Sequence, residues 1–439
     1  MDMKRLNQKY VKWHHDPLEY ENFLDKIAPV VLFVYKRIDH VTCVIDALKQ
    51  NPLSKYTTIY IYSDAAKDKQ DYENVSVVRR YLKGISGFKK IFIIEREKNW
   101  GLLANITSGV TEVVEQHGKV IVLEDDIVVS KYFLTYMNDA LNLYENDEKV
   151  MAVSGFWWST DKDTLPDTFF SPWFTVWGWG TWRRSWRCFD RNPSKVLREF
   201  PRDEIPFFNI YGEFDLWSQV EGNACGRLES WAVFFMINIW QKGGLVLHSK
   251  HDLCKNIGFD GTGEHCKSSF NDKFQRNDLW DGEVSSFTDC LEVNNEAVKS
   301  LVAWFDRQNK IAVKRTYEFI KFCREGKKIY CYGAGTYGIW VAGMLARIGC
   351  DIDAFLETEK TDRVDCYGRP VYSFSKKIRL DNVNIIVAAN LNNRMEMVRE
   401  LERQSIEDYF VLDDEIKICL PQVVNEIVKK YRIGFDYTH

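Results

Sequence analysis

The sequence of 439 residues lacks a long apolar stretch and any sign of a cleaved leader. No run of 18 apolar residues occurs, so we expect no helix that spans a membrane. Residues 1–12 are polar and basic and contain no apolar core segment, so we expect no signal peptide. The formal net charge of −4 gives no indication of bulk nucleic-acid binding.

Paired cysteine motifs are also missing. The 11 cysteines are scattered singly from Cys43 to Cys419, and none forms a C-x-x-C pair. An odd, unpatterned set is typical of reduced, buried thiols, so we expect a cytoplasmic protein. Hydrophobic residues at 45% and charged residues at 28% describe a globular chain with ample core. The length predicts two to three domains.

Apolar runs alternate with helical patterns through the first part of the chain. Strands are expected at 28–35, 57–62, 91–94, 120–123 and 150–154, and helices at 41–48, 102–114 and 130–144. This alternation predicts an α/β fold with a mostly parallel, Rossmann-like sheet. No G-x-G-x-x-G motif follows the first strand, which argues against a dinucleotide site there.

Three carboxylates stand side by side where a buried strand ends. Glu124, Asp125 and Asp126 directly follow the apolar run 120–123. Ligands in open α/β sheets bind beyond the carboxyl ends of strands. Adjacent carboxylates repel one another unless a positive group is close, and hard divalent cations prefer oxygen ligands. The triplet therefore indicates a metal site, with a solvated acidic turn as an equal alternative.

Two further segments have features of anion-binding sites. Asn99-Trp100-Gly101 opens the helix at 102–114 beside the basic Lys98, so its amino terminus can receive an anion or simply form a capped turn. The glycine-rich segment 256–265 ends in His265. Such a loop can close over a bound phosphate, or it is a surface loop with an incidental histidine.

Aromatic residues crowd the segment 156–186, which contains much of the chain's set of 15 tryptophans. They favour sugar stacking and a thick secondary core equally. Small and large residues alternate from Trp177 to Trp182, which lets the backbone approach a ligand. Glu229 precedes an apolar helix at 232–240, where the helix dipole would keep it ionised as a base or merely as a first-turn acid.

A second α/β unit follows a charged helical spacer. Its first strand, 328–332, leads into Gly333–Gly338, a G-x-G-x-x-G turn in its strand–turn–helix context. Glu357 ends the next strand, near the position of a ribose-binding acid. The same glycines also serve helix–strand packing, and no Tyr-x-x-x-Lys pair accompanies them. We therefore expect an accessory domain that does not bind NAD.

The last helix, 423–431, carries basic residues at its end. Lys429, Lys430 and Arg432 can contact anionic lipid, although a docked terminal helix is the commoner arrangement. The domain boundaries that these patterns predict are a lead-in at 1–26, a catalytic domain at 27–295, a helical linker at 296–326, a Rossmann-like accessory domain at 327–420 and a tail at 421–439.

In order and spacing, the segments between Ala28 and Cys266 resemble metal-dependent nucleotide-sugar glycosyltransferases of the GT-A fold. The resemblance is to the N-acetylglucosaminyltransferase that starts complex N-glycan branching and to related bacterial surface-polysaccharide transferases. The segments that carry it are 29–37, Ser63-Asp64, Asn99-x-Gly101, Glu124-Asp125-Asp126, Trp177-Gly178-Trp179-Gly180, Glu229-Ser230-Trp231 and the loop that ends at His265.

The resemblance implies a role for each of these positions. Asp126 and His265 would bind Mn²⁺ or Mg²⁺, and Glu124 and Asp125 would face ribose or metal-bound water. Asp64 would contact the base. The residues implied near the nucleotide or its phosphates are Lys36, Arg37, Lys98 and Asn99; those implied on the acceptor side are Trp177, Gly178, Trp179 and Trp231. The catalytic base would be Glu229, one place earlier than in the family, with Asp215 and Glu213 as reserves.

The implied activity is transfer of a hexose or N-acetylhexosamine, with inversion, from a UDP-sugar to a glycan or lipid-linked acceptor. Surface polysaccharide or glycoconjugate synthesis at the inner face of the membrane would be its setting. One alternative is a nucleotidyltransferase that makes sugar nucleotides, although the segment 35–38 is not the glycine-rich basic loop that such an enzyme needs. The other is a non-catalytic, nucleotide-binding interaction protein.

Overall fold

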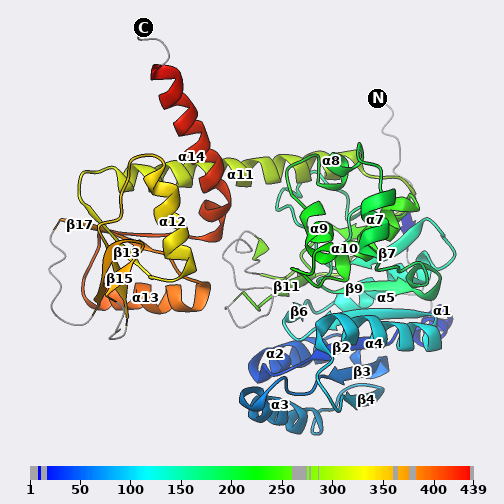
Figure 1. Cartoon of the computed structure of the whole chain (residues 1–439). Helices are drawn as coiled ribbons and strands as arrows, with labels where there is room; N and C mark the ends of the chain where they lie inside the picture. The colour runs from blue at the N-terminus through cyan, green and yellow to red at the C-terminus, as the bar shows by residue number, and fades with distance from the viewer. Residues whose placement is uncertain are drawn as a thin grey trace. The chain divides into compact units, whose positions relative to one another are not determined.

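The computed structural model describes residues 8–10, 17–259, 274–275, 278–284, 286–358, 364–374 and 382–435. These residues form two compact units (Figure 1). The first contains the described residues up to 257 together with those of 275–305. The second contains the described residues of 258–274 and those from 306 onward.

The first unit is built on an eight-stranded mixed sheet. Its strands, in spatial order, are β4 (Lys90–Glu95), β3 (Thr58–Ser63), β2 (Val30–Val34), β5 (Lys119–Glu124), β9 (Trp179–Trp182), β7 (Val150–Ser154), β10 (Leu245–Ser249) and β8 (Thr168–Ser171). Strands β9 and β8 are antiparallel to their neighbours, and the remaining pairs are parallel. The central strands β2 and β5 are buried, as their continuous apolar runs predict.

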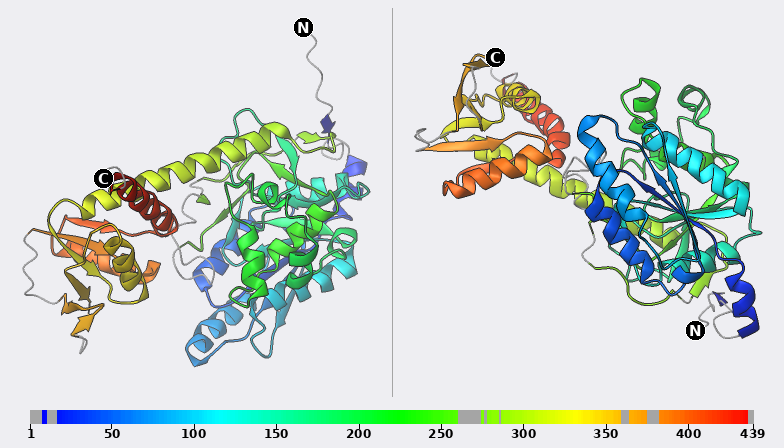
Figure 2. Two further views of the ribbon diagram at one scale, coloured as in Figure 1. Left: turned by 45° about the horizontal axis from the view of Figure 1, so that its top comes forward. Right: turned by 90° about the horizontal axis from the view of Figure 1, so that it is seen from below.

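Helices cover both faces of this sheet. The chain passes from β2 to β3 to β4 through α2 (Ile38–Lys49) and α3 (Lys69–Leu82) and returns to β5 through α4 (Gly101–His117). Right-handed crossovers in opposite directions place α2 and α3 on one face and α4 on the other (Figure 2). The other elements of this unit are β1 (Gln8–Tyr10), α1 (Pro17–Leu24), η2 (Ser54–Tyr56), β6 (Ile127–Val129), α5 (Phe133–Leu143), α6 (Arg183–Trp186), α7 (Pro193–Glu199), α8 (Ile205–Phe208), α9 (Trp217–Ala224), α10 (Ala232–Gln241), β11 (Cys254–Asn256) and β12 (Ser286–Thr288).

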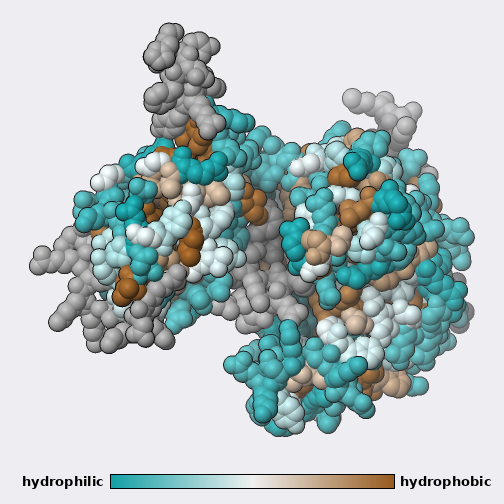
Figure 3. Space-filling view, in the orientation of Figure 1, coloured by the Kyte–Doolittle hydropathy of each residue, from teal (hydrophilic) through white to brown (hydrophobic). Residues whose placement is uncertain are grey.

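Some of the clustered aromatic residues form a core between β9, α6 and α10. Trp179 stacks on Trp231 with ring centroids 5.2 Å apart, and Phe235 lies against both Trp179 and Trp186. Trp179 is 1% exposed and Trp231 is 5% exposed. Hydrophilic residues accordingly cover most of the face shown in Figure 3. The core interpretation therefore accounts for these aromatic side chains.

The second unit contains a six-stranded sheet. Its strands, in spatial order, are β15 (Asp365–Cys366), β16 (Arg369–Ser373), β14 (Ala354–Glu357), β13 (Lys328–Tyr332), β17 (Val383–Val387) and β18 (Tyr409–Val411). All pairs are parallel except β15–β16. Its helices are α12 (Thr336–Ala346), α13 (Leu391–Arg403) and α14 (Asp414–Phe435), and α11 (Asn295–Cys323) leads into it.

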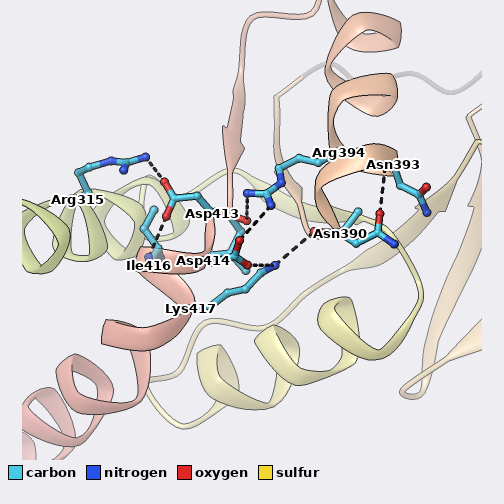
Figure 4. Close-up of polar contacts among 10 residues, drawn as sticks. Arg315, Asn390, Asn393, Arg394, Asp413, Asp414, Ile416 and Lys417 are labelled. Carbon is cyan, nitrogen blue, oxygen red and sulfur yellow. Dashed lines mark hydrogen bonds and ion pairs between the residues drawn. The ribbon is translucent and has the colours of Figure 1, made fainter. Parts of the chain in front are cut away.

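Buried charges link α13 and α14 where β17 and β18 end (Figure 4). The Lys417 ammonium lies 3.1 Å from an Asp414 oxygen and donates to the Ala389 carbonyl at 3.3 Å. Arg394 donates to the Leu412 carbonyl at 3.3 Å and lies 3.5 Å from Asp414. The opposite charges compensate one another, which permits their burial at this edge of the sheet.

The expected fold is confirmed: a mixed sheet with helices on both faces and a smaller Rossmann-like α/β unit. Some boundaries were wrong. The helix expected at 130–144 spans Phe133–Leu143, the final helix is longer than 423–431, and the short strand β6 was not predicted. Among the described residues, no helix combines the length and the apolar character that crossing a membrane requires.

Candidate functional site

The fold brings two predicted segments together at one point of the first sheet. Strand β2 pairs with β3 on one side and β5 on the other, so the strand order reverses between β2 and β5. The carboxyl ends of two such strands frame the crevice in which α/β proteins bind ligands. Residues 35–37 leave β2 at this point, and residues 124–126 leave β5 beside them.

Arg37 is ion-paired with two of the three acids. Its Nη2 atom binds Asp125 and lies 2.8 Å from an Asp126 oxygen. The backbone N–H of Tyr35 also donates to Asp125, at 3.2 Å. The Arg37 side chain is 15% exposed, and its Nη1 is buried without a hydrogen-bond partner among the described residues. The positive charge that adjacent carboxylates require is therefore supplied by the chain itself.

Burial and mutual repulsion perturb the acids themselves. The pKa of Glu124 is raised to about 8, chiefly by burial and then by the neighbouring Asp126 and Asp125 charges, against the opposing effect of Arg37. Burial also raises the pKa of Asp125, although the Arg37 guanidinium opposes this shift. The three acids can therefore ionise together only where a further positive charge joins Arg37, and a cation is a ligand that would supply it.

The two basic residues after β2 have different partners. The Lys36 ammonium lies 2.7 Å from an Asp71 carboxylate oxygen on α3, and Tyr35 Oη donates to the other oxygen at 2.7 Å. Burial raises the pKa of Asp71, but the hydrogen bonds from Lys36 and Tyr35 lower it by more, so the pKa lies below its usual value. Asp71 was not singled out from the sequence. Its two partners tie the end of β2 to α3.

Asp64 binds the amino terminus of α4. One of its carboxylate oxygens accepts from the N–H of Trp100 at 2.9 Å, and the other accepts from the N–H of Gly101 at 2.9 Å. The anion expected at this helix start is thus a side chain of the protein, held at the positive end of the helix dipole. A contact between Asp64 and a nucleotide base stays a prediction.

The residues around the start of α4 are a mixture of fixed and free groups. The Asn99 amide donates to the Ala65 carbonyl at 2.7 Å, whereas Lys98 is exposed. Arg79, which the sequence did not indicate, donates to the carbonyls of Asp64 and Arg96 at 3.2 and 2.8 Å. A pocket of about 500 Å³ opens beside these carbonyls; it is lined by Ala65, Ala66, Tyr72, Val75, Ser76, Arg79, Arg80, Lys83, Glu95 and Glu97.

Trp177 lies at the same edge of the sheet as the acids. Strand β9 runs antiparallel to β5 with its first residue, Trp179, opposite Val122, so Trp177 precedes β9 at the edge of the sheet where β5 ends. Trp177 is half-buried, with its ring 4.3 Å from that of Phe156 between centroids. Of the predicted stacking tryptophans it is the least buried, because Trp179 and Trp231 are in the core.

Gly178 serves packing in this structure. Its φ of 62° is left-handed, and a Cβ there would lie 2.3 Å from the Cys254 sulfur. At Gly178 it is therefore the Cys254 side chain, and not a ligand, that lies close to the backbone. Sugar stacking at Trp177 stays a prediction.

The backbone after the acids pairs with a distant segment. Strand β6 is antiparallel to β11, and the N–H of Ile257 donates to the Asp126 carbonyl at 2.9 Å. The chain that leads toward His265 therefore leaves from beside Asp126. His265 itself lies outside the described residues, so its assignment as a metal ligand stays a prediction.

The three candidate bases lie in the segments on either side of α9. Glu229 is exposed and lies three residues before α10, which begins at Ala232 as expected, with Trp231 as its N-cap. Asp215 is exposed as well, and its carboxylate accepts from the Ser218 N–H at 3.0 Å near the start of α9. Glu213 is half-buried. All three remain predictions as bases.

The carboxylate oxygens of the acidic cluster suit a hard cation that takes only part of its ligands from the protein. Among the described residues, no group of three His, Cys, Asp or Glu side chains is arranged to hold a metal ion. Mg²⁺-like ions, however, are usually bound through one or two carboxylates together with substrate phosphates and water. Asp125 and Asp126 supply such carboxylates at the mouth of the crevice.

In the second unit, the three glycines of the predicted nucleotide turn have different surroundings. A Cβ on Gly333 or Gly338 would lie 2.4 or 1.9 Å from a backbone oxygen, whereas one on Gly335 meets nothing within 4 Å. Gly333 and Gly338 are therefore required for packing. Gly335, the N-cap of α12, is open. Glu357 is half-buried at the end of β14.

No protein-family model matches the sequence, and no curated protein matches it. Similar solved structures include a mannosyltransferase from Pyrobaculum calidifontis in complex with GDP-Man and Mn²⁺, at 12% identity, with 49% of this chain and 69% of that chain covered and a TM-score of 0.31. A galactosyltransferase LgtC in complex with donor and acceptor sugar analogs has 13% identity, coverage of 63% and 95%, and a TM-score of 0.28.

A third similar structure is 4-diphosphocytidyl-2C-methyl-D-erythritol synthase from Anaerococcus prevotii, with 11% identity, coverage of 52% and 89%, and a TM-score of 0.28. Two of the three names are those of sugar transferases and one is that of a synthase. Likenesses at this level do not determine the activity of the chain, which has to be inferred from its own residues.

Proposed function

We infer that the first unit is a metal-dependent glycosyltransferase of the GT-A type, which transfers a sugar from a nucleoside diphosphate sugar to a hydroxyl of a glycan or lipid-linked acceptor. The observation that carries this proposal is the acidic cluster at 124–126, placed where the strand order of a mixed α/β sheet reverses. A UDP-sugar, a hexose or N-acetylhexosamine, inversion and a role in surface polysaccharide synthesis are the finer parts of the proposal.

The residues at the crevice suit this chemistry. Asp126, assisted by Asp125, would hold Mn²⁺ or Mg²⁺, whose charge stabilises a leaving diphosphate without proton transfer. The partly exposed Trp177 offers a ring face to a sugar beside the acids. A carboxylate on the acceptor side, for which we propose Glu229, removes the proton of the attacking hydroxyl. Asp64 and α4 shape the nucleotide side of the crevice.

The direct test is a screen of nucleotide sugars with Mn²⁺, in which both hydrolysis and thermal stabilisation are followed. We expect stabilisation by one nucleoside diphosphate sugar and its metal-dependent turnover. Asp126→Ala should abolish both while it leaves the circular dichroism spectrum unchanged. The matched control is Asp46→Ala, because Asp46 is an exposed acid on α2 whose side chain is 57% exposed. Metal-dependent turnover that survives in Asp126→Ala would contradict the assignment.

A further inference from the structure

Arg37 occupies the carboxylate oxygens that a cation would need. A single nitrogen, Nη2, binds both Asp125 and Asp126. A divalent ion bound to these two residues would either replace that nitrogen or lie next to a guanidinium charge. In both cases the Arg37 charge opposes metal binding, since like charges at such short range repel strongly in a partly buried site.

The neighbouring base does not share this role. The Lys36 ammonium is held by Asp71 on α3, and its own interactions are with that carboxylate and the Tyr35 ring. Of the two adjacent positive residues, only Arg37 is therefore directed into the acidic cluster.

Arg37 also has unused hydrogen-bonding capacity. Its Nη1 atom is buried without a partner among the described residues, which is costly for a charged donor. A diphosphate would satisfy it, because a guanidinium binds phosphate through two parallel N–H donors. The same event would release Asp125 and Asp126 for a cation.

We propose that Arg37 is a positioning residue that exchanges partners: it neutralises Asp125 and Asp126 while the crevice is empty, and it moves to the donor diphosphate when the divalent cation binds. This inference rests on the proposed function and concerns its regulation. Its consequence is that cation and nucleoside diphosphate bind cooperatively, each raising the affinity for the other by the same factor.

The test measures Mn²⁺ affinity by calorimetry or electron paramagnetic resonance, with and without UDP. In the unmodified chain we expect weak Mn²⁺ binding alone and at least about tenfold tighter binding with UDP. Arg37→Gln removes the competing charge but keeps an amide donor. It should bind Mn²⁺ alone at least about tenfold more tightly than the unmodified chain, with a smaller gain from UDP.

Two controls separate charge from other effects. Arg37→Lys keeps the positive charge and should retain weak Mn²⁺ binding without UDP. Arg187→Gln removes an arginine whose side chain is 63% exposed and ion-paired with Glu115, and it should behave like the unmodified chain. If Mn²⁺ binds with UDP but Arg37→Gln gives no tighter binding alone, the exchange is overturned and the proposed function stands. If Mn²⁺ binds neither the unmodified chain nor any variant, with or without UDP, the metal site and the proposed function are both overturned.

Discussion

At the scale of single residues, buried ionisable groups determine where the first unit carries charge and how its stability depends on pH. Some carry charge where ligands enter, as Arg37 and the three acids do. Others are kept neutral inside the sheet. His248 on β10 is fully buried, and its ring nitrogens lie 3.0 Å from Ser171 Oγ and 3.2 Å from the Phe156 carbonyl.

His248 gives a prediction about acid stability. Burial lowers its pKa to about 4, despite its hydrogen bonds to Phe156 and Trp173. The unfolded chain binds the proton first as the pH falls from about 7, so this residue should reduce the free energy of unfolding by on the order of 3 kcal/mol between pH 7 and pH 4. Urea unfolding of the unmodified chain and of His248→Gln at several pH values measures this difference.

Because carboxylates also contribute to acid unfolding, the informative quantity is the difference between the two proteins. The variant should lose less stability than the unmodified chain as the pH falls. Parallel pH profiles would show that His248 does not contribute.

At the scale of elements, carboxylates bind the first backbone N–H groups of two helices near the site. Asp64 supplies its carboxylate to α4, and Asp68 does the same for α3 by accepting from the N–H groups of Gln70 and Asp71. Asp64→Ala and Asp68→Ala should each cost about 1–2 kcal/mol of stability, as other helix caps do. On the proposed function, only Asp64→Ala should also weaken UDP binding, measured by calorimetry. Equal UDP affinity in the two variants would remove Asp64 from the nucleotide site.

The glycine turn before α12 gives a second prediction at this scale. Gly338→Ala forces a Cβ against the Gly333 carbonyl, which is backbone and cannot move aside, so we expect a loss of more than about 2 kcal/mol. Gly335→Ala meets open space and should cost about 1 kcal/mol or less. Thermal and urea unfolding of the two variants makes the comparison, and equal losses would contradict the packing described here.

The sequence predicted the elements better than it predicted their contacts. Continuous apolar runs located β2 and β5 because period and burial are local properties, and the acidic triplet was placed correctly at the end of β5. The pairing of Arg37 with these acids depends on β2 and β5 being neighbours, which no local pattern reveals. A basic residue directly after the first strand was the available signal.

The aromatic segment shows the opposite limit. Its composition favoured a sugar-binding wall and a core equally, and burial of Trp179 and Trp231 follows from packing between β9 and α10, which are far apart in the chain. Asp64 likewise has a local partner in space, the start of α4, that lies 36 residues further along the chain. Contacts over such separations depend on the order of strands in the sheet.

At the scale of the whole molecule, the chain contains two units with separate sheets, and the proposed activity belongs to the first. The packing of two glycines explains the turn in the second unit without a nucleotide. The continuous helix α11, with 29 residues, contributes Trp304 and Phe305 to the first unit and Phe319 and Ile320 to the core of the second.

Because α11 packs on both cores, local unfolding of either unit should leave the middle of this helix without support. Residues 306–314 in its middle are mostly exposed or half-buried, with Ala312 buried and Val313 packed on the second core, and a helix segment with so little packing is only marginally stable in water. Its backbone amide hydrogens should therefore exchange with deuterium as soon as either core opens, at a rate set by the less stable unit. Hydrogen-exchange mass spectrometry of the full chain, with and without UDP and Mn²⁺, measures this rate. If ligand binding slows exchange at 306–314, the first unit is the one that opens first; if the rate is unchanged, the second unit sets the lifetime of the helix.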